Sequence, residues 1–316
     1  MNNGFYEFSR GKQETTSSVF PYTGSAIITG SLQVVGSVSQ GSGTIASGSF
    51  SHAEGQSTVS LGDYSHAEGR ETIANVRGSH AEGHLTSASG GYSHAEGLQT
   101  LTIGNYSHAE GRRTTSSGQY SHAEGTDTIS SGPYSHAEGS SSLASGIASH
   151  AEGFQTIASG SYSHAEGFRT TASGSYSHAE GDSTQAIGNY SHAEGSGAVT
   201  YGEGSHAEGF ATIASGSYQH VQGQFNIASS AQSAFIIGNG TADNARSNLV
   251  FASGSTFQVT GSLNVSGSTT INNILTLQPR TTTPGSPTNG MLIVSGSGAD
   301  QHIYCYLNST WQKLNN

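Results

Sequence analysis

The chain has 316 residues, a formal net charge of −11, 45 glycines and only 10% charged side chains. Between residues 51 and 223, 17 acidic side chains stand against five arginines and no lysine, so we expect no binding to nucleic acid or to an anionic membrane. No apolar run approaches the roughly 20 residues of a membrane-spanning helix, and the single cysteine, Cys305, excludes an intrachain disulfide.

Two segments precede the repetitive part of the chain. Residues 1–23 are mixed and polar, with aromatic side chains at Phe5, Tyr6 and Phe20, and we expect them to form an attachment segment. Residues 24–44 contain the glycine-broken run AIITGSLQVVG, which predicts short β-strands. The first residues carry neither the basic nor the apolar stretch of a signal peptide, so we expect synthesis in a cytoplasm without one.

A repeat dominates residues 45–240. The pentapeptide Ser-His-Ala-Glu-Gly occurs twelve times from Ser51 to Ser205, always 14 residues after the previous copy, and a degenerate copy follows at Gln219. Repetition without insertions predicts one structural coil stacked on itself. Coils stacked at the strand spacing of ~4.8 Å would build a rod on the order of 60 Å long.

Each coil has the pattern of two short strands. Counting the motif serine as position 1, glycine at positions 5 and 12 marks two corners, position 8 is threonine in ten copies, and position 14 is tyrosine in nine. In the coil of Ser121 the predicted strands are residues 120–124 and 128–130. Glycine, serine and threonine at this density disfavour a helix.

The last part of the chain departs from the repeat. Residues 241–278 form a transition unit, in which TFQVTGSLNVSG at 256–267 echoes the strand unit before the repeat. The proline-containing stretch 279–287 predicts a linker. It opens a small terminal module, residues 279–316, whose two predicted strands at 290–295 and 303–307 close on Trp311.

The 14-residue period and the S-x-A-x-G motif resemble the left-handed parallel β-roll heads of trimeric autotransporter adhesins. The run AFIIGNGT at 234–241 resembles segments that end such rolls, while the Gly-Ser-Leu-x-Val-x-Gly units and the C-terminal module resemble bacteriophage tail fibres. The resemblance implies an all-β, left-handed parallel β-roll in a homotrimeric fibre, with small β modules at both ends. A coil this thin buries little surface, which also favours a trimer.

The second and fourth motif positions depart from the adhesin heads, because they are usually aliphatic there and are His and Glu here. Strand alternation places Tyr120, His122 and Glu124 on one face, and their constancy indicates packing. We predict a structural ladder in which His and Glu pair by hydrogen bonds, within or between chains. The predicted ladder residues are His122, Glu124, His136, Glu138, His150, Glu152, His164 and Glu166.

The repeat has three other interpretations besides this ladder. His-x-Glu brought together at a trimer axis would supply metal ligands, although a carboxylate for every His predicts a roll that needs no metal or cofactor. The threonine column would be compatible with an ice-binding face, whereas a hydrogen-bonded ladder is the commoner reason for such a column. Twelve equivalent copies without a nucleophile or a pocket predict that the protein is not an enzyme.

Together these features predict a structural fibre of a phage virion. Residues 1–23 would attach the homotrimer to other virion proteins, and the C-terminal module would contact a host surface receptor. Tyr304, Tyr306 and Trp311 are the candidate receptor contacts, and their alternative role is to form the module's own core. The alternative function is a bacterial or injection-system adhesin built on the same roll.

Overall fold

The computed structural model describes residues 35–266, 269–270, 279–280, 287, 289, 291–295 and 302–314. They fall into two compact units, divided after Thr260. These described residues contain strands and turns but no helix, and hence no helix long and apolar enough to cross a membrane. The predicted attachment segment, residues 1–23, and the predicted strand unit up to residue 34 lie outside the described residues.

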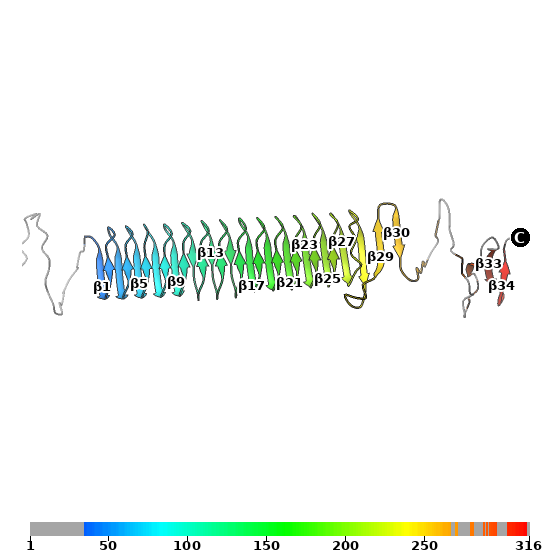
Figure 1. The fold of residues 1–316 in the computed structure, drawn as a ribbon, viewed down its shortest axis with the longest axis horizontal. Helices are drawn as coiled ribbons and strands as arrows, with labels where there is room; N and C mark the ends of the chain where they lie inside the picture. Colours follow the sequence, from blue (N-terminus) through cyan, green and yellow to red (C-terminus); the bar gives the residue numbers. More distant parts are fainter. Residues whose placement is uncertain are drawn as a thin grey trace, which may run out of the picture. The chain divides into compact units, whose positions relative to one another are not determined.

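The first unit is a parallel β-solenoid in which each coil gives one strand to each of two sheets (Figure 1). This confirms the predicted all-β roll of 14-residue coils. The strands of the first sheet within the roll are β1 (Val38–Ser42), β3 (His52–Gln56), β5 (His66–Arg70), β7 (His80–His84), β9 (His94–Leu98), β11 (His108–Ala109), β13 (His122–Ala123), β15 (His136–Ala137), β17 (His150–Phe154), β19 (His164–Phe168), β21 (His178–Asp182), β23 (His192–Ser196), β25 (His206–Phe210) and β27 (His220–Gln224).

The second sheet is built from two-residue strands. They are β2 (Ile45–Ala46), β4 (Val59–Ser60), β6 (Ile73–Ala74), β8 (Ser87–Ala88), β10 (Leu101–Thr102), β12 (Thr115–Ser116), β14 (Ile129–Ser130), β16 (Leu143–Ala144), β18 (Ile157–Ala158), β20 (Thr171–Ala172), β22 (Gln185–Ala186), β24 (Val199–Thr200) and β26 (Ile213–Ala214). In both sheets a residue pairs with its counterpart 14 positions on, as His136 does with His150. Equivalent side chains therefore stack in columns along the roll.

Small side chains fill the interior of the roll. Ala137 is fully buried, and Ser135 and Thr128 are no more than 2% exposed. The Ser135 hydroxyl donates a hydrogen bond to the carbonyl of Gly132 at 2.6 Å, and it lies 2.6 Å from the Ser130 hydroxyl. Position 8 is buried in all twelve coils, so the threonine column presents no surface to ice. The ice-binding interpretation is therefore wrong.

The motif glycine at position 5 is required by the close approach of neighbouring coils. Gly125 has a φ of +100°, and a Cβ added to it would lie 2.2 Å from the carbonyl oxygen of Gly139. Backbone of this conformation is strained for any residue with a side chain. Both conditions recur in coil after coil, which explains why no other residue occupies this position.

The tyrosine before the motif lies in a turn, and its predicted place in the strand is wrong. Tyr120 has a φ of 59° and is 46% exposed. The left-handed conformation turns the chain, so that the strand begins only at His122 and strand alternation does not extend to the tyrosine. The tyrosine rings stack on one another instead, with centroids 5.1 Å apart for Tyr120 and Tyr134.

The roll ends in antiparallel strands (Figure 1). β28 (Phe235–Asn239) still pairs in parallel with β27, but His220 now lies beside Phe235, because the last coil is one residue longer. β29 (Asn248–Ser253) and β30 (Thr256–Val259) then follow as an antiparallel pair. The change of direction stops the solenoid from growing.

The second unit contains a small sheet of four strands. They are β31 (Pro279–Arg280), β32 (Leu292–Ser295), β33 (His302–Leu307) and β34 (Thr310–Lys313). β32, β33 and β34 are antiparallel, whereas β31 runs parallel to β32. The stretch 279–287 therefore begins with a strand and is not wholly a linker, and residues 281–286 of it lie outside the described part of the chain.

Candidate functional site

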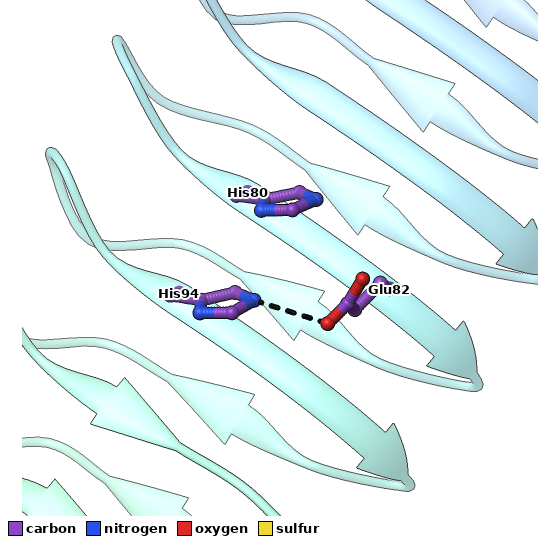
Figure 2. Close-up of side chains that lie close together, drawn as sticks. All are labelled: His80, Glu82 and His94. Atoms are coloured by element: carbon purple, nitrogen blue, oxygen red, sulfur yellow. Dashed lines mark ion pairs between the residues drawn. The ribbon is translucent and has the colours of Figure 1, made fainter.

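A continuous column of His and Glu side chains runs along the outward face of the first sheet. Residues two apart on a strand point to the same side, so the motif His and Glu share this face while the alanine between them points inward. Figure 2 shows His80 and Glu82 on β7, with His94 beside them on β9. From His52 to His206 the imidazole rings stack in parallel, with centroids 4.6–4.9 Å apart.

Each histidine from His94 onward lies nearest the glutamate of the preceding coil. The Nε2 atom of His94 is 3.5 Å from Oε1 of Glu82 (Figure 2), and the same atom of His150 is 3.3 Å from Oε1 of Glu138. The pairs that contain the predicted ladder residues are Glu110–His122 at 3.6 Å, Glu124–His136 at 3.4 Å, Glu138–His150 at 3.3 Å, Glu152–His164 at 3.5 Å and Glu166–His178 at 3.2 Å.

The structure thus brings all eight predicted ladder residues together. It also adds two residues that the prediction did not name: Glu110 approaches His122, and His178 approaches Glu166. The same pentapeptide marks both, so the sequence carried the signal for them. The side chains are only half-buried, with 34% exposure for His150 and 32% for Glu138.

Most of these contacts lack the geometry of a hydrogen bond. Among the described histidines, His150 and His178 form a hydrogen bond with a glutamate, at 3.3 and 3.2 Å. The Nε2 atoms of ten others are buried without a hydrogen-bond partner in the chain: His52, His66, His80, His94, His108, His122, His136, His164, His192 and His206. A buried polar atom without a partner costs free energy, so the column holds unused capacity for binding.

Burial and crowding control the charge of the histidines. Desolvation lowers the pKa of His122 and His150, and the neighbouring imidazoles lower it further. Burial acts in the same direction on the pKa of the imidazoles of His66, His80, His94, His164 and His192. These seven imidazoles are therefore mostly neutral at pH 7, since burial penalises the charged form.

The glutamates form a second column in which neighbouring carboxyls interact. A hydrogen bond with Glu180 raises the pKa of Glu194 to about 7, with burial adding to it. The neighbouring carboxyl of Glu152 likewise raises the pKa of Glu138 and of Glu166. The hydrogen bond that raises the pKa of Glu138 lowers that of its partner, Glu152. Along this stretch, carboxyls that keep a proton therefore alternate with carboxyls that lose it, which is the expected response of like charges held at the strand spacing.

A groove follows the glutamate column. One stretch of about 930 Å³ is lined by Glu166, Glu180, Glu194, Glu208, Gln222, the motif glycines beside them, and Ile237. A second stretch of about 670 Å³ is lined by the glutamates from Glu54 to Glu124 and by their glycines. The motif serines point into the roll, away from this groove, so the repeated arrangement pairs a base with an acid but supplies no serine nucleophile.

The three C-terminal aromatic residues lie together in the second unit. Tyr304 and Tyr306 are on β33 and Trp311 is on β34, and all three are half-buried. The rings of Tyr306 and Trp311 meet edge to face with centroids 5.1 Å apart, while Tyr304 meets His302 edge to face at 6.4 Å. Two of the three candidate receptor contacts therefore pack against each other.

Comparison with known families identifies the type of repeat. Residues 39–65 and 165–191 match the model of the YadA head domain repeat, in two copies. Both matches lie within the roll, and the comparison with curated proteins found no match. The match and the parallel solenoid with its 14-residue period fit a structural architecture rather than an enzymatic one. The roll is a repeat like that of trimeric autotransporter adhesin heads, and these repeats indicate an adhesin-like fibre.

Proposed function

We propose that the chain forms a homotrimeric adhesin-like fibre in which the His–Glu faces of three rolls pack around a common axis. One observation carries this proposal: the outward His and Glu positions of the first sheet are identical in all twelve motif copies, whereas the outward position 9 of the second sheet varies from Ile129 to Gln185. Solvent imposes no such constancy, but packing against another copy does.

The oligomeric state and the packing face are tested with one pair of cysteine variants. The single native cysteine, Cys305, is first replaced by serine. Glu138→Cys places a thiol on the proposed interface, and Gln155→Cys places one on an exposed corner of the roll. We expect light scattering to give three chain masses of 32.3 kDa and oxidation to cross-link only the Glu138→Cys protein. A folded monomer, or cross-linking of Gln155→Cys alone, would overturn the proposal.

For the carrier of the fibre we propose a phage virion, with residues 1–23 bound to other virion proteins. The support is the pair of Gly-Ser-Leu-x-Val-x-Gly units at residues 30–36 and 261–267, which resemble units of tail fibres. A bacterial or injection-system adhesin is the second candidate, and the match to the YadA head repeat favours it. Antibody labelling in electron microscopy separates the two, because a virion fibre labels phage particles and an adhesin labels cell surfaces.

A further inference from the structure

We propose that the His–Glu column binds divalent transition-metal ions of borderline softness, such as Zn²⁺ or Ni²⁺, in a linear array. The donors of each site are the Nε2 atoms of two successive motif histidines and a carboxylate oxygen of the glutamate between them. In one such set, His80, Glu82 and His94, the donor atoms all lie within 4.8 Å of one another (Figure 2). The set recurs along the roll, for example as His136, Glu138 and His150.

The distances within a set are close to those that an ion requires. Zinc binds imidazole nitrogen and carboxylate oxygen at about 2.0–2.2 Å, so two donors on one ion lie no more than about 4.3 Å apart. The Glu82–His94 pair, at 3.5 Å, and the Glu138–His150 pair, at 3.3 Å, meet this limit as they stand. The second imidazole has to move by roughly half an ångström, and half-exposed side chains at the edge of an open groove permit this.

The column also presents its donors in the right chemical state. A histidine binds a metal only when the ligating nitrogen carries no proton, and the Nε2 atoms of His80, His94 and His136 are buried without a partner in the chain. The adjacent carboxyls repel one another at the strand spacing, and a bound cation would relieve this repulsion.

The donor set selects the kind of ion. Calcium prefers six to eight oxygen ligands and magnesium an octahedron of oxygens, whereas each set here offers two nitrogens and one carboxylate. Imidazole with carboxylate suits zinc, copper and nickel. All three donors come from one chain, so the proposal does not depend on the trimer. Backbone pairing already holds neighbouring coils together, so the ion is a ligand of the folded roll and not a condition for folding.

The experiment uses the full chain without a polyhistidine tag. The protein is stripped with chelator and dialysed, and the binding of ZnCl₂, NiCl₂ and MgCl₂ is measured by calorimetry and by elemental analysis after desalting. We expect several zinc or nickel ions per chain and no binding of magnesium. Zinc also raises the melting temperature, because a ligand of the folded state stabilises that state.

Matched variants locate the ions. The triple variant His136→Gln, His150→Gln, His164→Gln should bind fewer ions than the unaltered chain, whereas His84→Gln, which removes a histidine outside the column, should bind as many. The milder pair Glu138→Gln, Glu152→Gln provides the same test should the triple variant fail to fold. Absence of zinc and nickel binding to the unaltered chain overturns the proposal, and so does unchanged binding to the folded column variants.

Discussion

The Nε2 atom of His150 lies 3.3 Å from Oε1 of Glu138 on the preceding coil. This contact joins two turns of the solenoid through side chains, in addition to the backbone pairing between β15 and β17. Because the coils are in register, the contact recurs at each step from His94 onward, as between His136 and Glu124 at 3.4 Å. We therefore expect the protonation of this repeated pair of residues to change the stability of the roll.

The melting temperature of the roll should fall between pH 7.5 and pH 5.5. Seven histidines have a pKa below the ordinary value of 6.5 in the folded state, with desolvation as the largest cause: His66, His80, His94, His122, His150, His164 and His192. The unfolded chain then binds more protons than the folded chain as the pH falls through 6.5, so acid favours unfolding. Thermal unfolding followed by circular dichroism at the two pH values measures the effect.

Three glutamates should oppose this acid-induced fall in melting temperature, and a variant of one of them provides a control. Carboxyl–carboxyl hydrogen bonding raises the pKa of Glu194 to about 7, and it also raises the pKa of Glu138 and Glu166. The folded chain takes up protons at these sites before the unfolded chain does, which adds stability as the pH falls. Glu194→Gln removes one such contribution, so its melting temperature should fall more steeply with acid. A melting temperature that rises on acidification would contradict the histidine argument.

Replacing the motif glycine Gly195 should destabilise the roll strongly, whereas replacing Gly197 in the following turn should be tolerated. Gly195 has a φ of +101°, and a Cβ there would lie 2.3 Å from the carbonyl oxygen of Gly209. Gly197 has a φ of +65° and no atom nearer than 3.8 Å to such a Cβ. Gly197→Ala should therefore cost only about 1 kcal/mol for the left-handed conformation, whereas Gly195→Ala should cost several times more. Denaturant unfolding of both variants measures their free energies of unfolding. Equal losses of stability would contradict the close approach of Gly195 to the next coil.

The sequence predicted the solenoid because one constraint recurs at a fixed interval. The 14-residue period, the two strands and the corner glycine all follow from positions that do not vary, such as Gly125 and Gly139. The sequence did not predict that His150 pairs with the glutamate of the preceding coil. Which coil supplies the glutamate depends on the direction in which the side chains lean across the sheet. Alternation along a single strand carries no information about that direction.

The errors had a physical cause that the sequence partly revealed. Strand alternation predicts Tyr120 in a strand, but the equivalent positions Gly78 and Gly204 have φ values of 65° and 60°. Glycine in place of tyrosine at one repeat position is a sign of a left-handed turn. The burial of the threonine column had no such sign, since a threonine fits an inward and an outward position of a strand equally well.

Two interior threonines should respond in opposite ways to the loss of their hydroxyl. The Thr128 hydroxyl donates a hydrogen bond to the carbonyl of Glu124 at 2.9 Å, whereas the Thr156 hydroxyl is buried without a partner in the described chain. Thr128→Val should cost about 1 kcal/mol, while Thr156→Val, which keeps the shape, should be neutral or stabilising. Equal destabilisation of the two, measured by urea unfolding, would show that both hydroxyls are satisfied in solution.

Removing metal should leave the roll folded. Backbone pairing holds every coil to the next, as between β17 and β19, and buried alanine and threonine fill the interior without any ion. Exhaustive chelation of protein to which no metal has been added should therefore leave the melting temperature unchanged, because the ion only adds stability when it is present. A large drop on chelation, reversed by Zn²⁺ or Ni²⁺, would show that the ion is part of the fold.

The C-terminal unit should carry the contact with the host, and residues 1–23 the attachment. Deleting residues 280–316 removes the strands β32 to β34 together with Tyr304, Tyr306 and Trp311. The truncated fibre should remain on its carrier, because the deletion leaves the roll and the attachment segment intact. Adsorption of the carrier to the host should fall, because the proposed contact is missing.

The mass of the truncated assembly is measured first, since a loss of assembly would also abolish adsorption. Tyr304→Ala gives a milder test, because this ring is not part of the Tyr306–Trp311 contact. Loss of the fibre from the carrier after the C-terminal deletion, with retention after deletion of residues 1–20, would reverse the polarity of the fibre.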